Sequence, residues 1–314
     1  MKQSSRPFSD LDKINLSRSS PIKMKNSPLR FSAAILALAS TAIGAEPEIE
    51  IVKNVAFLGA DRAQKLDLYL PPDSGKPRPA ILIVHGGGWH GGDKAAGREI
   101  NIGTNLAKAG FVCASVNYVL AEKKESFVDN LRQVWPRNLQ ECMTAVKFLR
   151  ANAEKFRINP DKIGAIGGSA GGHLVAMLAY ASDDDGLDPK DELYGDHSCR
   201  IQAVVPMYGV YDLLQLAERR KMLAELSEED KALCRAASAV SYLDASDPPA
   251  LLLHGTRDPL VPLAQSERLN EALTAAKLTN ELHVVNGGKH SFHLEPAQED
   301  LRPLVIEFFN RHLK

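Results

Sequence analysis

A serine among glycines stands where an apolar run changes into a helical pattern. The segment KIGAIGGSAGGHLVAMLAY (162–180) passes from strand-like residues through GGSAG into apolar residues at helical spacing. The pattern G-x-S-x-G between a strand and a helix is typical of a nucleophile elbow, a strained turn that lifts a serine hydroxyl above the sheet edge. Glycines also make ordinary tight turns, and serine is a common helix N-cap. Whether Ser169 is a nucleophile therefore depends on its partners elsewhere in the chain.

A glycine cluster, HGGGW at residues 85–89, directly follows the apolar run AILIV. Consecutive glycines leave backbone N–H groups unshielded, which an oxyanion hole requires where a tetrahedral intermediate develops negative charge. A phosphate-binding loop would need G-x-x-x-x-G-K-[ST], and Lys94 is followed by neither Ser nor Thr. We therefore expect an oxyanion hole here, with His85 as a structural hydrogen-bonding residue rather than a base.

Two further loops supply an acid and a base. HGTRDPLVP (254–262) follows the run ALLL, and its Asp258 suits the carboxylate that orients a catalytic histidine. GGKHSF (287–292) follows ELHVV and carries His290 on a glycine-rich loop. The chain order Ser169, Asp258, His290 is the Ser, Asp, His order of α/β-hydrolases and predicts that Ser169 is a nucleophile. The alternatives are Asp212, Asp244 and Asp247 for the acid, and His293 for the base.

These motifs need a scaffold that brings them together. Strand-like and helical runs alternate from residue 80 onward, which predicts an α/β domain with a mostly parallel sheet and helices on both faces. Residues 49–70 predict an antiparallel hairpin, and the charged stretch 212–240 a small cap insertion. The expected strands are 80–84, 111–118, 163–166, 203–208, 250–253 and 281–285, and the expected helices 100–109, 138–152, 173–180, 264–277 and 301–312. Active sites in such sheets lie beyond the carboxyl ends of the strands, where all four motifs stand.

With these motifs, the sequence resembles carboxylesterases of the α/β-hydrolase superfamily that carry an HGGGW oxyanion motif. The resemblance covers about residues 50–314 and rests on HGGGW, NYVL, NPDKIGAIGGSAGGHL, HGTRDPLVP and GGKHSF. It is closest to hormone-sensitive-lipase-like esterases and to acetyl-xylan or feruloyl esterase-like BD-FAE enzymes. The segment with the acid, HGTRDPLVP, differs from the Asp-Pro-Leu-x-Asp-Glu segment usual in hormone-sensitive lipases. It is more like the segment of BD-FAE and prolyl-oligopeptidase-related enzymes. The resemblance implies an α/β-hydrolase fold for residues 46–314.

The resemblance also implies a serine ester hydrolase that works through an acyl-enzyme, with no metal or organic cofactor. Ser169 would attack an ester carbonyl, His290 would carry the proton, and Asp258 would orient the imidazole. The oxyanion would be bound by backbone N–H groups of Ala170 and, carried over from the family, of Gly87 and Gly88.

The expected partner is a small-molecule or carbohydrate ester, with short-chain, acetyl or feruloyl groups as the expected acyl parts. Three aromatic residues near the motifs could line an acyl or sugar pocket, or be core or rim residues: Trp89, Tyr118 and Tyr208. The nearest alternative functions are an arylformamidase-like amidase and a prolyl-oligopeptidase-like peptidase. The first is typically intracellular, and the second typically needs an accessory domain for which this chain has no room. A non-catalytic binding module is the least favoured alternative, because such relatives usually lose the serine or the histidine.

The N-terminal residues predict export. The apolar run FSAAILALASTAI (31–43) follows basic residues and precedes small residues, as in a secretory signal cleaved near Ala45. Residues 1–45 are therefore expected to be a signal region, and a compact signal begins at Met24, where we expect translation to start. A retained membrane anchor is the alternative. Cleavage would leave a secreted or periplasmic enzyme with no stable membrane insertion.

Charge and composition bear on nucleic-acid binding, membrane binding, metal sites and disulfides. A formal net charge of −1 offers no electrostatic basis for binding nucleic acid or an anionic membrane. The nine histidines include no HExxH and the four cysteines no CxxC, so no metal site is expected. Export would permit disulfides, and Cys199–Cys234 is the expected pair if one forms.

Overall fold

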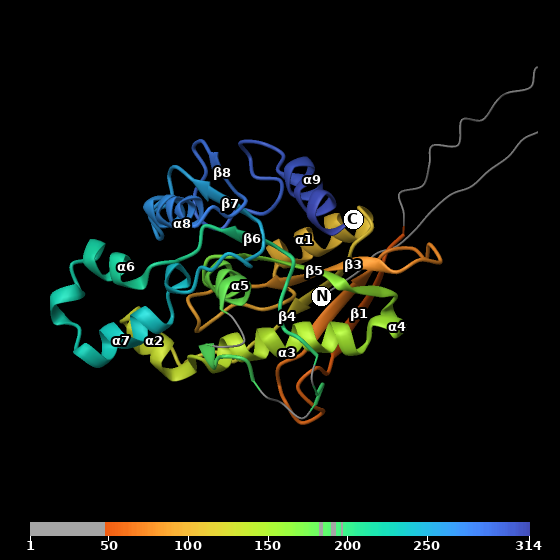
Figure 1. Ribbon diagram of the computed structural model, residues 1–314, viewed down its shortest axis with the longest axis horizontal. Helices are drawn as coiled ribbons and strands as arrows, with labels where there is room; N and C mark the ends of the chain where they lie inside the picture. Colours follow the sequence, from red (N-terminus) through yellow and green to blue (C-terminus); the bar gives the residue numbers. More distant parts are fainter. Residues whose placement is uncertain (1–47, 182–184, 190–192, 196) are drawn as a thin grey trace, which may run out of the picture. The chain divides into compact units, whose positions relative to one another are not determined.

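The computed structural model describes residues 48–181, 185–189, 193–195 and 197–314, which belong to one compact unit, Ala45–Lys314 (Figure 1). The expected signal region, including Met24 and residues 31–43, lies outside the described residues. No helix in the described segments is long and apolar enough to cross a membrane.

An eight-stranded sheet forms the centre of this unit, in the order β1-β2-β4-β3-β5-β6-β7-β8. Its strands are β1 (Glu50–Val55), β2 (Leu66–Leu70), β3 (Arg78–Val84), β4 (Val112–Val116), β5 (Ile158–Gly168), β6 (Ala203–Met207), β7 (Ala250–Gly255) and β8 (Asn280–Val285). Strand β2 is antiparallel to β1 and β4, and every other neighbouring pair is parallel. The predicted hairpin and the predicted mostly parallel sheet are both confirmed.

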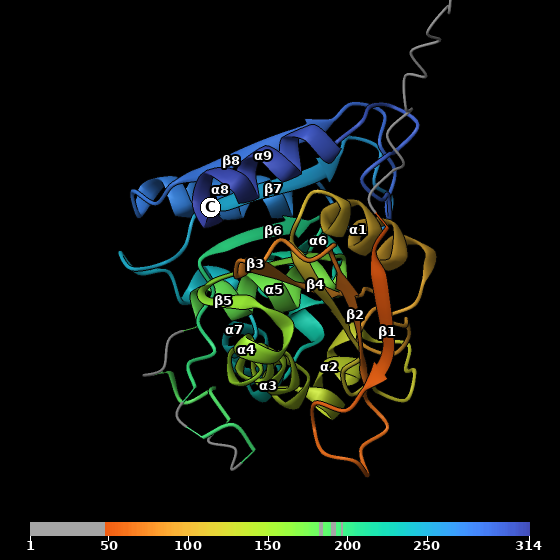
Figure 2. The same ribbon diagram turned by 90° about the vertical axis from the view of Figure 1, so that its right-hand side faces the viewer.

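Helices cover both faces of the sheet (Figures 1 and 2). They are α1 (Gly97–Lys108), α2 (Phe127–Val134), α3 (Arg137–Ala151), α4 (Ala153–Phe156), α5 (Ala170–Tyr180), α6 (Leu213–Arg219), α7 (Glu228–Ala236), α8 (Ala264–Ala275) and α9 (Arg302–Leu313). Side chains alternate across β3, so that Ile81 and Ile83 join the apolar cluster under α1 and α9. Leu82 and Val84 join the opposite cluster with α3, α5 and α8.

The stretch 212–240 lies between β6 and β7 and contains α6, the short 3-10 helix η2 (Leu223–Glu225) and α7. Helix α7 packs against α2, and the Arg132 guanidinium forms a salt bridge with the Asp230 carboxylate between them. Helix α2 departs from the expectation, since the sequence analysis predicts no helix there. The cap therefore combines α2 with the stretch 212–240, two segments that are distant in sequence.

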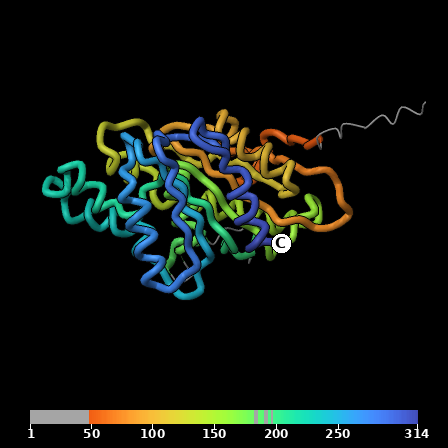
Figure 3. The backbone as a smooth tube through the Cα atoms, turned by 90° about the horizontal axis from the view of Figure 1, so that it is seen from above, coloured from red at the N-terminus to blue at the C-terminus, as the bar shows by residue number. Residues whose placement is uncertain are grey.

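The parallel strands direct their carboxyl ends toward one edge of the sheet. Seen from above, the stretch 212–240, in teal, projects at the left of the view (Figure 3). HGGGW follows β3, Ser169 follows β5, Asp258 follows β7 and His290 follows β8. The loops that carry these residues are distant in sequence, and the sheet topology alone brings their starting points to the same edge.

Candidate active site

Ser169 occupies a sharp turn between β5 and α5. Its φ of 59° and ψ of −121° lie in a region that non-glycine residues rarely adopt, so the turn is strained. Its N–H donates to the carbonyl of Met207 at 2.9 Å, and this hydrogen bond ties the turn to the end of β6. A Cβ atom at Gly171 would lie 2.0 Å from the carbonyl oxygen of Val84. The small neighbours expected for an elbow are therefore required by backbone contact.

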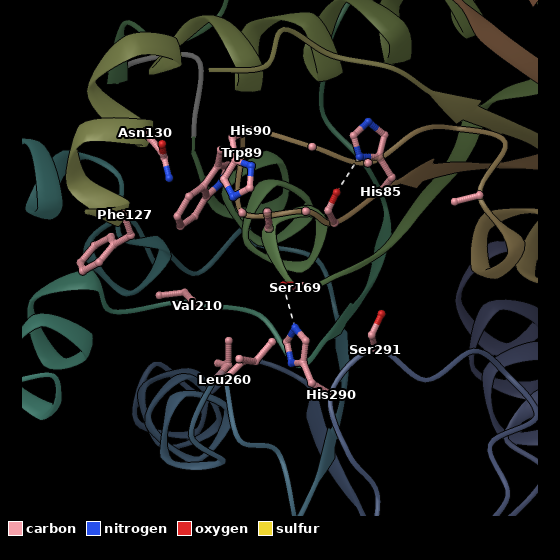
Figure 4. A pocket seen from close by; sticks show the side chains of 18 of the residues that line it. His85, Trp89, His90, Phe127, Asn130, Ser169, Val210, Leu260, His290 and Ser291 are labelled. Carbon is pink, nitrogen blue, oxygen red and sulfur yellow. Dashed lines mark hydrogen bonds between the residues drawn. The ribbon is translucent and has the colours of Figure 1, made fainter. Parts of the chain in front are cut away.

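The side chains of Ser169, His290 and Asp258 form one hydrogen-bonded line. Ser169 Oγ lies 2.9 Å from His290 Nε2, and His290 Nδ1 lies 2.6 Å from Asp258 Oδ2. Figure 4 shows the imidazole pointing at the serine across the cleft. With an ionised Asp258, Nδ1–H donates to the carboxylate and Nε2 is left to accept the serine proton.

The Asp258 carboxylate is buried but well supplied with donors. Its Oδ1 accepts the backbone N–H groups of Leu260 at 2.8 Å and Val261 at 2.9 Å. Its Oδ2 faces His290, and His254 Nε2 lies 3.4 Å away. Burial alone would raise the pKa of Asp258, but hydrogen bonds from His254, His290 and the Val261 N–H outweigh it and hold the pKa well below its usual range. The carboxyl group is therefore ionised at neutral pH.

His254 is a site residue that the sequence analysis does not assign. It is fully buried, and its Nδ1 lies 2.7 Å from Ser266 Oγ, which fixes the ring beside the carboxylate. Its position as the first residue of HGTRDPLVP, at the end of β7, is the signal that points to it.

Unused backbone donors lie beside Ser169. Gly87 and Gly88 have φ values of +117° and +59°, and in the described part of the chain their N–H groups donate to no protein acceptor. The Gly87 carbonyl accepts from His90 and Gly91 at 3.2 and 3.0 Å, which closes the loop. Ala170 begins α5, where the first N–H groups have no intrahelical partner. All three residues line the same cleft as Ser169.

His173 links the HGGGW loop to the cap. Its Nδ1 accepts from Trp89 Nε1 at 3.2 Å, and its Nε2 donates to the carbonyl of Ala237 at 2.7 Å. Burial lowers the pKa of His173 to about 4, so the ring is neutral with both nitrogens engaged. Trp89 lines the cleft, and its role as a substrate contact stays a prediction.

Tyr118 and Tyr208 do not line the cleft, which corrects their candidacy as substrate contacts. Tyr118 is buried and stacked on His85 with ring centroids 4.4 Å apart, and its hydroxyl donates to the His85 carbonyl at 2.9 Å. Burial lowers the pKa of His85 to about 4, consistent with a structural role. Tyr208 is buried too, with its ring against the imidazole of His290 and its hydroxyl donating to the carbonyl of Phe292. Both tyrosines therefore support the loops around the cleft and are not part of its wall.

The other candidates for the acid and the base have different surroundings. Asp212 caps α6 by accepting from the Gln215 N–H at 3.0 Å. Asp247 accepts from the Asp244 N–H at 2.8 Å. Among the described contacts, none joins Asp212, Asp244 or Asp247 to His290. His293 lines the cleft, and its Nδ1 accepts from the Glu295 N–H at 3.1 Å.

The Cys199–Cys234 disulfide, the expected pair if one forms, is absent from the structure. Both residues are buried thiols outside any disulfide, as are Cys113 and Cys142. Cys234 packs into the apolar cluster from the inner face of α7, and Cys199 joins that cluster from the segment before β6. Each thiol thus fills core space instead of forming a covalent link.

The cleft around Ser169 has a volume of about 940 Å³. Figure 4 shows Phe127, Val210 and Leu260 on one side of Ser169 and Ser291 on the other. Apolar lining residues that the sequence analysis does not identify are Phe127, Val210, Leu216, Leu260 and Val261. Phe127 could have been found from Ser126, an N-cap followed by apolar residues at helical spacing, and Leu260 from its position two residues after Asp258.

Arg98 connects the cleft to the loop that carries His290. Its guanidinium forms a salt bridge with buried Glu99, at 2.5 Å between Nη2 and Oε1. Nη1 donates to Ser291 Oγ at 3.2 Å and to the Tyr208 hydroxyl at 3.4 Å. The charge of Arg98 is thus matched inside the protein, and its remaining donors hold residues adjoining His290.

Comparison with known proteins relates most of the chain to esterases. The sequence model of the BD-FAE family matches residues 66–273. Esterase LipQ of Mycobacterium tuberculosis is 31% identical over 253 residues, which cover 77% of this chain and 57% of LipQ. The chain thus spans less than two thirds of the length of this curated relative.

Two solved structures share the fold. A truncated carbohydrate esterase from gut microbiota superposes with a TM-score of 0.70 at 24% identity, covering 85% of this chain and 96% of that one. An acetyl ester-xyloside bifunctional hydrolase from Caldicellulosiruptor lactoaceticus gives a TM-score of 0.65 at 25% identity, covering 80% and 89%. The α/β-hydrolase fold expected from the sequence is confirmed. Because the family's model matches well over half of the sequence, the chain belongs to the BD-FAE family.

Proposed function

We propose that the chain is a serine hydrolase that cleaves carboxylic esters. The observation that carries the proposal is the hydrogen-bonded line from Ser169 Oγ through His290 to Asp258, with distances of 2.9 and 2.6 Å. A hydroxyl, an imidazole and an ionised carboxylate in this order can generate a nucleophile at neutral pH. The relationship to esterase LipQ supports the same reaction type.

The reaction proceeds through an acyl-enzyme. Ser169 Oγ attacks the ester carbonyl while His290 Nε2 accepts its proton, and the ionised Asp258 stabilises the imidazolium that forms. The imidazolium then gives the proton to the leaving alcohol, and water, deprotonated by the same ring, releases the acid. The oxyanion accepts hydrogen bonds from the backbone N–H groups of Gly87, Gly88 and Ala170.

We infer that the substrates are short-chain or carbohydrate-linked esters. The cleft reaches the surface at Leu260, which is 58% exposed, so a bulky alcohol can extend into solvent. Its apolar side suits a short acyl chain or an aromatic one. The names of the two structural neighbours, a carbohydrate esterase and an acetyl ester-xyloside hydrolase, point to the same substrate class.

We propose further that the enzyme is exported, to the periplasm or the medium. The support is the apolar run 31–43 between basic residues and small ones, with cleavage near Ala45. N-terminal sequencing of protein recovered from outside the cytoplasm tests this directly. A mature N-terminus upstream of residue 31 would contradict it.

The experiment that tests the activity compares wild type with Ser169→Ala on 4-nitrophenyl acetate and butyrate, acetylated xylan, methyl ferulate and N-formylkynurenine. Wild type is expected to cleave the esters, and loss of the nucleophile should lower turnover by about 10⁴-fold or more at unchanged unfolding temperature. Ser74→Ala, at an exposed loop position, is the matched control. Full activity in Ser169→Ala would refute the serine mechanism, and exclusive cleavage of N-formylkynurenine would identify an amidase.

A further inference from the structure

An arginine of the cap is positioned in the wall of the cleft that holds Ser169. Arg220 follows α6 as its C-cap residue and lines the cleft. Its guanidinium lies over the ring of Phe127, 5.5 Å from the centroid, and its Nη2 donates to the carbonyl of Leu260 at 3.2 Å. These two contacts join α6 to α2 and to the loop after β7. The guanidinium is therefore held between two walls of the cleft.

Among the described residues, no carboxylate matches the charge of Arg220. None of the ion pairs formed by the described residues includes Arg220, whereas Arg98 in the same cleft is paired with Glu99. A guanidinium has five N–H donors, and Leu260 uses one of them. Partial burial of the group lowers the pKa of Arg220, because desolvation opposes its charge and no carboxylate offsets this.

The surroundings favour an incoming anion. Val210, Leu216 and Val261 are buried apolar residues of this side of the cleft, and a wall of low polarity strengthens the attraction between charges. The carboxylate of Asp93 is engaged by Asn117 and by the Ala95 N–H, at 2.8 Å each. The other charged lining residues outside the Arg98–Glu99 pair are Lys123, Lys124 and Glu125. With Asp93 counted, the residues that line the cleft carry four positive and three negative side chains, so one positive charge is in excess.

We propose that Arg220 is a specificity-determining residue that binds a carboxylate on the substrate, so that the preferred esters carry a carboxylate in the part that occupies the apolar side of the cleft. A planar guanidinium recognises a carboxylate through two parallel hydrogen bonds, which gives direction as well as charge. This inference rests on the proposed ester hydrolysis and narrows its substrate class. The carboxylate belongs to the acyl part or to the alcohol, and the two sources need separate substrates.

Paired esters distinguish these two sources. For the acyl part, the 4-nitrophenyl monoester of glutaric acid is compared with 4-nitrophenyl pentanoate. For the alcohol, 4-acetoxybenzoate is compared with its methyl ester. Wild type should prefer the carboxylate ester in one pair by about tenfold or more in kcat/KM, mainly through KM, and added salt should reduce the preference.

The variants isolate Arg220 from general charge effects. Arg220→Gln should remove the preference by lowering kcat/KM for the carboxylate ester much more than for its neutral partner, while Arg220→Lys should restore part of it. Arg219→Gln is the matched control, because Arg219 is the exposed last residue of the same helix and does not line the cleft. It changes the net charge and the charge at the helix C-terminus equally, and should leave the preference intact.

A binding measurement separates this inference from the proposed reaction. Calorimetry on Ser169→Ala should show tighter binding of the preferred carboxylate ester than of its neutral partner, and Arg220→Gln in that background should abolish the difference. Two results would overturn the role of Arg220 and leave the proposed ester hydrolysis standing. One is a wild type that cleaves both esters of each pair equally well, and the other is an equal loss on both esters in Arg220→Gln. Selective binding without hydrolysis of any ester would instead support the anion site and refute the proposed reaction.

Discussion

The ring of Tyr208 packs edge-on against the imidazole of His290, with centroids 5.1 Å apart. Its hydroxyl donates to the carbonyl of Phe292 at 2.5 Å and accepts from Arg98. The buried phenol thus holds both the ring and the backbone of the loop that must direct Nε2 at Ser169. Tyr208 supports the geometry of the site without touching the cleft.

Tyr208→Phe should separate the contribution of the hydroxyl hydrogen bonds from that of the ring packing, because it keeps the ring and removes the hydroxyl. We expect kcat to fall about tenfold with little change in KM, and the free energy of unfolding to fall by about 1–2 kcal/mol, since the Phe292 carbonyl loses its donor. Steady-state kinetics and urea unfolding measure the two effects. Tyr194→Phe is the control, because its hydroxyl also donates to a carbonyl, of Phe57 at 2.6 Å, but outside the cleft. Equal kinetic losses in both variants would contradict the positioning role.

Asp258→Asn tests the ionised carboxylate. The amide can donate to Nδ1 and leave Nε2 carrying the proton, which is the wrong tautomer for accepting one from Ser169. We expect kcat for a short-chain ester to fall by about 10³- to 10⁴-fold. Asp212→Asn, which alters the cap of α6, should leave kcat within about twofold. A loss below tenfold in Asp258→Asn would show that another group orients the ring.

The sheet and the proximity of Ser169, Asp258 and His290 could be predicted from the sequence. Both follow from the apolar pattern of the strands and from the position of each residue after a strand. The apolar runs of β3 and β5 are too uniformly apolar for an exposed strand, so a sheet covered on both faces is the natural solution. Ser169, Asp258 and His290 each stand at the carboxyl end of a strand, and parallel strands place those ends together.

The walls of the cleft could not be predicted in the same way. Phe127 stands on an eight-residue helix after a polar loop, and Arg220 on a cap whose helices are placed by tertiary packing. Tyr208 follows a strand as the three site residues do, yet its side chain points inward under Gly168, where a Cβ atom would lie 2.7 Å from its hydroxyl oxygen. Position after a strand therefore predicts proximity, and only packing decides which side chains reach the cleft.

Gly171→Ala tests whether the elbow needs its glycine. A Cβ there would meet the carbonyl oxygens of Val84 at 2.0 Å and His85 at 2.6 Å, and backbone atoms of central strands cannot easily move. We expect a loss of at least about 3 kcal/mol in unfolding free energy, or no soluble protein. Gly97→Ala, in the first turn of α1 with nothing within 4 Å, should be neutral or stabilising. Similar unfolding midpoints for the two variants would mean that the elbow relaxes without cost.

The neutral state of His173 predicts how stability depends on pH. Protonation would turn Nδ1 into a donor facing the Trp89 N–H, and burial already lowers the pKa of His173 to about 4. The unfolded chain, with an ordinary histidine pKa of about 6.5, takes up the proton first, so stability is lost as pH falls from about 6.5 toward 4. Between pH 7.5 and pH 5 this amounts to about 2 kcal/mol from His173.

His173→Gln isolates this contribution, since an amide can accept from Trp89 and donate to Ala237 but does not titrate. Burial also lowers the pKa of His85 to about 4, and it raises that of Asp247 to about 7, which acts in the opposite direction. Both residues are common to wild type and variant, so their effects cancel in the comparison. Urea unfolding at the two pH values should show a smaller loss in His173→Gln by about 2 kcal/mol. Parallel pH profiles would mean that His173 accepts a proton in the folded protein as readily as in the unfolded chain.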